Sequence, residues 1–177
     1  SLNATLRPYQ EDGVSWMGAL EALGCGGILA DDMGLGKTLQ AITHLLARRE
    51  AGDAGLTLVV CPASLVYNWM AELERFAPAL RARAVLGSKD ARRREIESAS
   101  HADASDAADA VDVLVTSYDL MRRDIELYQN LQLRRAILDE AHYIKNPGAQ
   151  VTMAAKCLPA QARFALTGTP MENRLGE

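Results

Sequence analysis

Residues 27–42 read GILADDMGLGKTLQAI, and this stretch decides the fold. Four apolar residues typical of a strand come first, a glycine-containing loop follows, and a helical pattern begins near Lys37. Glycines let backbone amides close on phosphate oxygens, and the positive end of the helix dipole points at the same place. Lys37 is then placed to reach the β- and γ-phosphates of a nucleotide, and Thr38 to ligate magnesium. The stretch predicts a strand, loop and helix that together hold a nucleotide phosphate.

The glycine loop is incomplete by itself, because Asp31 stands where the usual G-x-x-x-x-G-K-[ST] pattern has its first glycine. A second motif supports it. Residues 133–142, LRRAILDEAH, read as a short apolar strand that ends in two carboxylates. We expect Asp139 to hold magnesium through water, and Glu140 to orient or deprotonate the attacking water. Such carboxylates are common as helix caps or solvated turns when seen alone. After a Lys-Thr glycine loop they indicate an NTPase.

The composition is that of an ordinary globular chain. With 177 residues, 49% of them hydrophobic and 24% charged, it suits a single α/β domain. The formal net charge of -4 means that any nucleic-acid binding must be local. Local arginine groups exist, and each is interpreted as a solvated face rather than a phosphate site. These groups are Arg48 with Arg49, Arg81 with Arg83, Arg92 to Arg94, Arg122 with Arg123, and Arg134 with Arg135.

The three cysteines and three histidines show no metal-ligand spacing, and the cysteines are odd in number and far apart. Neither a disulfide framework nor a zinc site is therefore predicted, and a reducing compartment fits best. The longest apolar runs are only strand-sized, so we expect a soluble intracellular protein with no membrane partner.

Strand and helix patterns alternate along the chain. Helices are predicted over 8–23, 65–76, 89–97 and 118–128, and strands over 56–61, 84–86, 112–116, 136–138 and 163–166. Residues 98–110 have no apolar period and are expected to form a mobile surface loop. Trp69 falls on the apolar stripe of its helix, which favours core packing over base stacking. The alternation predicts a parallel, doubly wound sheet, whose ligands sit beyond the carboxyl ends of the strands.

Four segments together resemble the Swi/Snf-type ATPases of helicase superfamily two. They are LRPYQ at 6–10, DDMGLGKT at 31–38, DEAHYIKNP at 139–147 and LTGTPMEN at 166–173. VCPASLVYNW at 60–69 and VTSY at 115–118 are similar to DNA-contacting motifs of that family. The resemblance runs nearly end to end. It implies a RecA-like P-loop NTPase fold, mainly a parallel sheet with helices on both faces. Asp32 replaces the Glu common in the family, which keeps the loop acidic.

The resemblance implies a role for each matching residue, with ATP and Mg²⁺ as cofactors. Catalysis is implied for Lys37, Asp139 and Glu140, and metal binding for Thr38 and Asp139. Nucleotide binding is implied for Arg7, Gln10, Asp32, Met33, Gly34, Leu35, Gly36, Lys37 and Thr38. Contacts to DNA phosphates are implied for Ser64, Asn68, Thr116 and Ser117, and coupling of the two sites for His142, Thr167 and Thr169. From the residues alone, Gln10 can also be an exposed helix residue and Arg7 a surface charge, His142 a residue that packs or caps a loop, and the Thr-Gly-Thr-Pro run a turn.

The implied function is the ATP-binding lobe of a DNA-dependent ATPase that translocates on double-stranded DNA and remodels protein–DNA complexes. The chain starts at Ser1 and stops at Glu177, so residues 1–177 are expected to be the first RecA-like lobe of a longer polypeptide, without the second lobe. The isolated lobe is then expected to hydrolyse ATP weakly. The full-length protein is expected to be located with DNA, associated with the nucleoid in a bacterial cytoplasm or in the nucleus of a eukaryote. A strand-separating helicase, a restriction-system motor and a non-cycling nucleotide-dependent binding module remain as alternatives.

Overall fold

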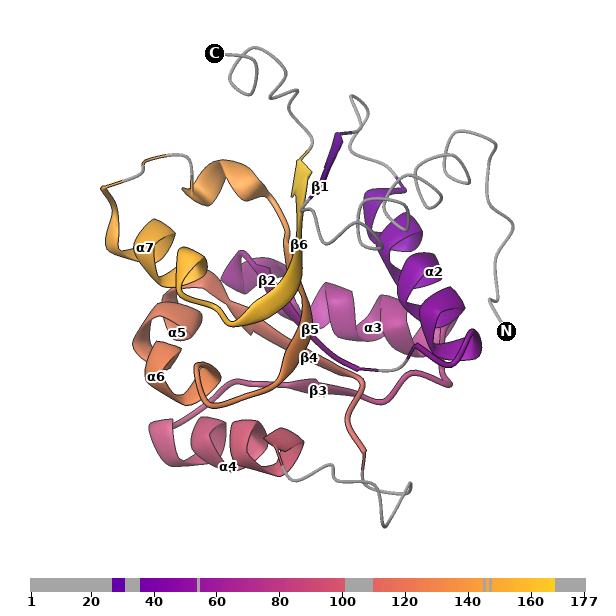
Figure 1. Cartoon of the computed structure of the whole chain (residues 1–177), viewed down its shortest axis with the longest axis horizontal. Helices are drawn as coiled ribbons and strands as arrows, with labels where there is room; N and C mark the ends of the chain where they lie inside the picture. Colours follow the sequence, from indigo (N-terminus) through magenta and orange to yellow (C-terminus); the bar gives the residue numbers. More distant parts are fainter. Residues whose placement is uncertain are drawn as a thin grey trace.

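Six parallel strands form one sheet at the centre of the molecule (Figure 1). The computed structural model describes residues 27–30, 36–53, 55–100, 110–144, 146 and 148–167, with the backbone alone at 27–30 and 167. The strands are β1 (Gly27–Ala30), β2 (Leu56–Cys61), β3 (Ala82–Ala84), β4 (Val113–Ser117), β5 (Leu133–Leu138) and β6 (Ala160–Thr167). Their order across the sheet is β1-β6-β5-β2-β4-β3, and every neighbouring pair is parallel.

Helices cover both faces of this sheet, as predicted from the sequence. One face is covered by α2 (Lys37–Glu50) and α3 (Val66–Phe76), and the other by α4 (Lys89–Ser100), α5 (Tyr118–Arg123), α6 (Ile125–Tyr128) and α7 (Gln150–Lys156). Two short 3-10 turns, η1 (Ala63–Leu65) and η2 (Ala141–Ile144), follow β2 and β5. Successive residues of β2 point to opposite faces, so Val59 packs with α2 and α3 while Leu58 and Val60 pack with the other layer.

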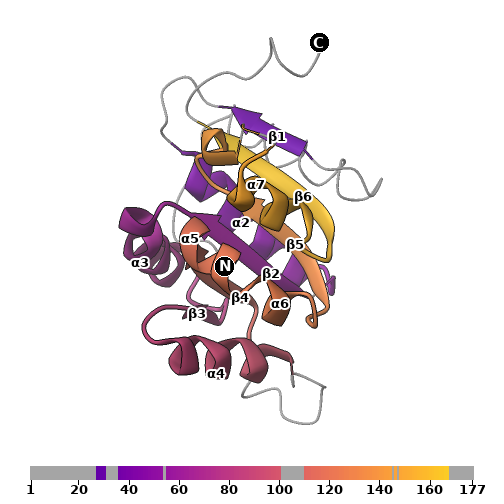
Figure 2. The same ribbon diagram turned by 90° about the vertical axis from the view of Figure 1, so that its left-hand side faces the viewer.

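The strand order places the two predicted motifs close to each other. Figure 2 shows the strands running from β1 through β6 and β5 to β2 and β4, with β3 next to α4. The glycine loop follows β1 and the Asp-Glu pair follows β5, with only β6 between these two strands. Because all strands are parallel, both motifs emerge at the same carboxyl edge of the sheet. In the part of the chain that the structure describes, no helix has the length and apolar character to cross a membrane.

Several predicted element boundaries were wrong. Strand β3 spans 82–84 rather than 84–86, because its short, half-exposed alanines pair at an edge where the apolar signal is weak. Helix α4 continues through residues 98–100, since Ala99 is buried one turn after Ile96; the remainder of the predicted loop, 101–109, lies outside the described residues. The helix predicted over 118–128 is two helices that meet at Asp124, and α7 was not predicted.

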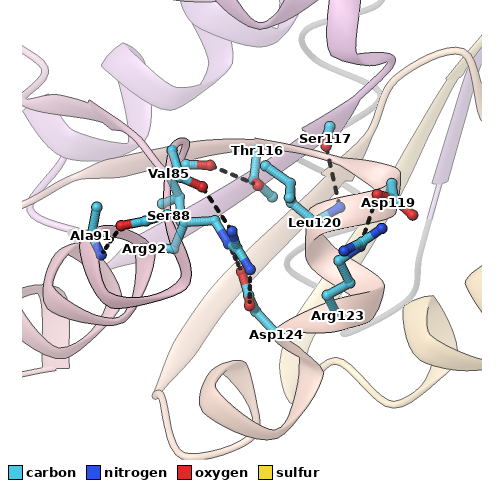
Figure 3. Close-up of polar contacts among 11 residues, drawn as sticks. Val85, Ser88, Ala91, Arg92, Thr116, Ser117, Asp119, Leu120, Arg123 and Asp124 are labelled. Carbon is cyan, nitrogen blue, oxygen red and sulfur yellow. Dashed lines mark hydrogen bonds and ion pairs between the residues drawn. The ribbon is translucent and has the colours of Figure 1, made fainter.

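Two arginines predicted to lie on solvated faces are buried instead. Arg92 is 8% exposed and makes a two-pronged contact with Asp124, Nε to Oδ2 at 2.7 Å and Nη2 to Oδ1 at 3.0 Å (Figure 3). Its Nη1 donates to the carbonyl of Gly87 at 2.8 Å. Arg135 is 2% exposed, and its Nη2 lies 3.5 Å from a carboxylate oxygen of Asp53. Paired carboxylates explain why these charges tolerate burial.

Candidate active site

The helix that follows the glycine loop starts in a conformation suited to phosphate binding. Gly36 is the N-cap of α2 and has a φ of 87°, in the left-handed region that glycine adopts without steric cost. Its carbonyl accepts the first helical hydrogen bond, from the amide of Gln40 at 2.9 Å. Lys37 is the first residue of the helix and Thr38 the second. The predicted lysine and threonine therefore lie at the positive end of a 14-residue helix.

Lys37 reaches the second motif. Its Nζ lies 3.3 Å from Oε1 of Glu140, 103 residues further along the chain. The Lys37 side chain is nearly buried, and the Glu140 side chain is 30% exposed. Glu140 also has a φ of 48°, the one left-handed backbone among the non-glycine residues described. Such strain costs about 1–3 kcal/mol and is concentrated at functional sites. The structure thus joins the two predicted motifs through one ion pair, at a residue with a strained backbone.

Asp139 is held on several sides. It is 4% exposed, and its Oδ2 accepts a hydrogen bond from Nε1 of Trp69 at 2.8 Å. Its Oδ1 accepts from the amide of Glu140 at 2.9 Å, and its own amide donates to the carbonyl of Val60 at 2.8 Å. Burial raises the pKa of Asp139, while the hydrogen bond from Trp69 and the charge of Lys37 act in the opposite direction.

Aromatic rings surround the turn that follows the two carboxylates. Nδ1 of His142 lies 3.4 Å from Oε2 of Glu140, and its ring centroid is 5.0 Å from that of Tyr143. Tyr143 stacks on Tyr118, with centroids 5.3 Å apart and ring planes 4° from parallel. The Tyr118 hydroxyl donates to the carbonyl of Asp139 at 2.6 Å. His142 therefore lies beside a proposed catalytic carboxylate.

The four predicted DNA-contacting residues divide into two pairs. Ser64 and Asn68 are exposed, at η1 and the first turns of α3. Ser117 is only 3% exposed, and its hydroxyl accepts a hydrogen bond from the amide of Leu120 at 3.2 Å, which caps α5. Thr116 is fully buried, and its hydroxyl donates to the carbonyl of Val85 at 3.1 Å (Figure 3).

The burial of Thr116 corrects its predicted role. It lies in β4, all five residues of which are buried between the two helical layers, so its hydroxyl does not face a surface that DNA could reach. Instead it ties β4 to the segment that leads from β3 into α4. We therefore treat Thr116 as a structural residue. Ser117 ends the same buried strand and is 3% exposed, so its hydroxyl caps α5 rather than facing a surface that DNA could reach.

The other predicted residues lie at or beyond the limits of the described structure. Thr167 ends β6, where it pairs with Ala30 of β1, and only its backbone is described. This register places it beside the strand that leads into the glycine loop. The predicted residues outside the described ranges are Arg7, Gln10, Asp32, Met33, Gly34, Leu35 and Thr169.

A family profile described as the SNF2-related domain matches residues 9–177. The chain belongs to this family. Among its relatives, the TATA-binding protein-associated factor mot1 of Aspergillus fumigatus is 39% identical over 189 residues, which cover 100% of the chain and 10% of that protein. An uncharacterized ATP-dependent helicase of Mycoplasma pneumoniae is 38% identical, over 97% of the chain and 16% of its own length.

Solved structures of the SNF2-related family share the fold. The ATPase core of a Sulfolobus solfataricus SWI2/SNF2 protein in complex with dsDNA superposes with a TM-score of 0.83 at 37% identity, covering 98% of the chain and 34% of that structure. The core domain of a Sulfolobus solfataricus SWI2/SNF2 ATPase gives a TM-score of 0.76 at 40% identity. These matches confirm the RecA-like fold and the resemblance to Swi/Snf-type ATPases. The chain spans about a tenth of the mot1 protein and about a third of the solved cores.

Sequence reasoning did not find two residues that touch Asp139. Trp69 was predicted to be a core residue, and it is fully buried, but its indole N–H also bonds the carboxylate. Tyr118 was considered as the start of a helix and as the last residue of the VTSY segment at 115–118. A buried Trp or Tyr nearly always needs a partner for its polar atom, and this rule was the available signal. It does not say which partner is used.

Proposed function

We propose that this chain is the ATP-binding lobe of a DNA-dependent, Swi/Snf-type ATPase that moves on double-stranded DNA and remodels protein–DNA complexes. The observation that carries the proposal is the 3.3 Å contact between Lys37 and Glu140 at the carboxyl edge of the sheet. It joins the two halves of an NTPase motif that lie 103 residues apart in the sequence. Membership of the SNF2-related family supports the choice of ATP and of DNA.

The residues at the edge fit a magnesium nucleotide. Gly36 provides the left-handed turn that opens helix α2 toward a phosphate, and Lys37 supplies a cation. Both carboxylate oxygens of Asp139 already accept one hydrogen bond, yet a carboxylate has about four acceptor sites, so lone pairs remain for magnesium or its waters. Thr38 would be the other ligand. Bound Mg-ATP supplies the γ-phosphoryl group and the charge that activates it toward water.

Each of these side chains would then have a separate role in hydrolysis. Lys37 would neutralise phosphate charge, and the Asp139 carboxylate would hold the metal. Glu140 would position a water and take its proton, because its partly exposed carboxylate lies next to the lysine. His142, within 3.4 Å of Glu140, would report the state of that carboxylate to the neighbouring turn. Arg7 and Gln10 would contact the adenine.

DNA would lie along the same edge, beyond the nucleotide. Ser64 and Asn68 are exposed there, and their hydroxyl and amide groups can bond phosphate oxygens without reading bases. Such contacts suit a motor that is indifferent to sequence. A related SWI2/SNF2 core is solved with dsDNA, which supports double-stranded rather than single-stranded DNA as the track.

The proposal requires a second RecA-like lobe in the same polypeptide. Such a lobe would bring the arginine that stabilises the transition state, and its absence lowers hydrolysis by roughly 10³- to 10⁵-fold. Thr167 and Thr169 would couple hydrolysis to movement of the two lobes. We place the whole protein with DNA, in the nucleus or the bacterial nucleoid, with a protein bound to DNA as its target.

Two substitutions in the full-length protein test the assignment. Lys37→Ala should abolish binding of a fluorescent ATP analogue, and Glu140→Gln should keep binding while reducing hydrolysis by about 10²-fold or more. Lys156→Ala and Glu74→Gln, at exposed positions on α7 and α3, are the matched controls and should leave both unchanged. If neither Lys37→Ala nor Glu140→Gln changes the ATPase rate, the catalytic assignment is wrong.

A further inference from the structure

Asp139 accepts hydrogen bonds from residues on both faces of the sheet. Trp69, on α3, belongs to the buried cluster on one face, and its indole N–H bonds the carboxylate at 2.8 Å. Tyr118, the first residue of α5, belongs to the cluster on the opposite face, and its hydroxyl bonds the backbone carbonyl of Asp139 at 2.6 Å. Trp69 is 0% exposed and Tyr118 4% exposed, so these hydrogen bonds do not compete with solvent.

Trp69 and Tyr118 each come directly after a residue predicted to contact DNA. Asn68 precedes Trp69 and is exposed at the first turns of α3. Ser117 precedes Tyr118, and its hydroxyl fixes the start of α5. Trp69 and Tyr118 are each joined by one peptide unit to a residue predicted to contact DNA. A shift of the first turn of α3 would therefore move the indole that touches Asp139.

Tyr118 also connects Asp139 to the other carboxylate. Its ring stacks on Tyr143 in the turn after the Asp-Glu pair, with centroids 5.3 Å apart. Tyr143 adjoins His142, whose Nδ1 lies 3.4 Å from Glu140. Tyr118 thus bonds the backbone of Asp139, and His142, at the other end of this row of rings, lies next to the side chain of Glu140.

We propose that Trp69 and Tyr118 are positioning residues that hold Asp139 from the two faces of the sheet, and that Trp69 transmits DNA engagement at the exposed first turn of α3 to the Asp139 carboxylate. The inference rests on the proposed function, since it requires DNA at this edge and a magnesium nucleotide at Asp139. Neither residue touches substrate. Each acts by holding Asp139, so the loss of either hydrogen bond should weaken the coupling between the two ligands more than it weakens the binding of DNA.

The coupling is measured as binding, without hydrolysis. The affinity of the full-length protein for a non-hydrolysable ATP analogue with Mg²⁺ is determined with and without saturating duplex DNA, and the ratio is the coupling factor. Ratios of about 5 to 150 are typical of coupled sites. Tyr118→Phe keeps the stacked ring and removes one hydroxyl, and it should reduce the ratio by roughly 2- to 10-fold, as expected for one buried hydrogen bond. Trp69→Phe should act in the same direction.

Tyr128→Phe is the matched control, because Tyr128 is buried on the same face as Tyr118 but interacts with Thr116 and Arg92 rather than with Asp139. It should keep the wild-type ratio. Thermal unfolding shows whether each variant is folded. If Trp69→Phe does not fold, Tyr118→Phe alone tests the inference. If folded Tyr118→Phe has the same coupling factor as the wild type, the inference is wrong. It is also wrong if DNA does not change the nucleotide affinity of the wild-type protein. ATP hydrolysis that never responds to DNA contradicts the proposed function instead.

Discussion

At the scale of single residues, Gly36 is the position where backbone conformation and function coincide. Its φ of 87° is unfavourable for any residue with a Cβ. Gly36→Ala should cost about 1–2 kcal/mol of stability and also weaken nucleotide binding, because this residue starts the helix that we propose faces the phosphates. Urea unfolding and titration with a fluorescent ATP analogue measure the two effects.

Gly52 provides a control for Gly36. It has a φ of 83° in the turn after α2, with open space where a Cβ would lie, and it is far along the helix from Lys37. Gly52→Ala should therefore show a similar loss of stability with unchanged nucleotide affinity. Equal losses of affinity in both variants would mean that Gly36 matters only for folding.

At the scale of elements, the buried pair of Arg92 and Asp124 joins α4 to the point where α5 and α6 meet (Figure 3). Removing one partner leaves an uncompensated buried charge, which costs about 3–5 kcal/mol. Arg92→Leu should therefore lower the free energy of unfolding by about that amount, as measured in urea. Arg93→Leu changes an exposed neighbour on the same helix and should stay within roughly 0.5 kcal/mol of wild type.

The sequence predicted helices and strands better than it predicted which side chains contact one another. The apolar stripe of α3 was correct, and Trp69 is buried as that stripe required. The hydrogen bond from Trp69 to Asp139 could not be predicted, because periodicity gives a buried face and not the atom opposite it. The same limit explains Arg92: its local cluster looked solvated, and only the fold brings Asp124 beneath it. Thr116 shows the converse error, since a motif match does not reveal that both faces of β4 are covered.

At the scale of the whole molecule, a charge network holds the sheet edge opposite the active site. Asp53, after α2, contacts Arg48 and lies 3.5 Å from both Arg134 and Arg135 at the start of β5. The hydrogen bond from Arg48 and the nearby positive charges hold the pKa of Asp53 below its ordinary value of 3.8. The network links the end of one helix to a central strand.

The lowered pKa gives the network a pH dependence. A group whose pKa is lower when folded stabilises the fold above its ordinary pKa, and this stabilisation is lost as the pH falls through the folded value. Asp53→Asn should therefore reduce stability at about pH 7, and the difference from wild type should shrink below pH 3.8. Urea unfolding across this range measures it. Asp119→Asn, at an exposed pair on α5, should have a smaller effect.

The edge carrying Lys37 and Glu140 is proposed to hydrolyse ATP in response to double-stranded DNA. The most direct measurement is the ATPase rate of the full-length protein as duplex DNA is titrated, for wild type and Glu140→Gln. The wild-type rate should rise to a plateau, while the Glu140→Gln rate should stay at least about 10²-fold lower at every DNA concentration. A wild-type rate that does not respond to DNA, or equal rates for the two proteins, would contradict the proposal.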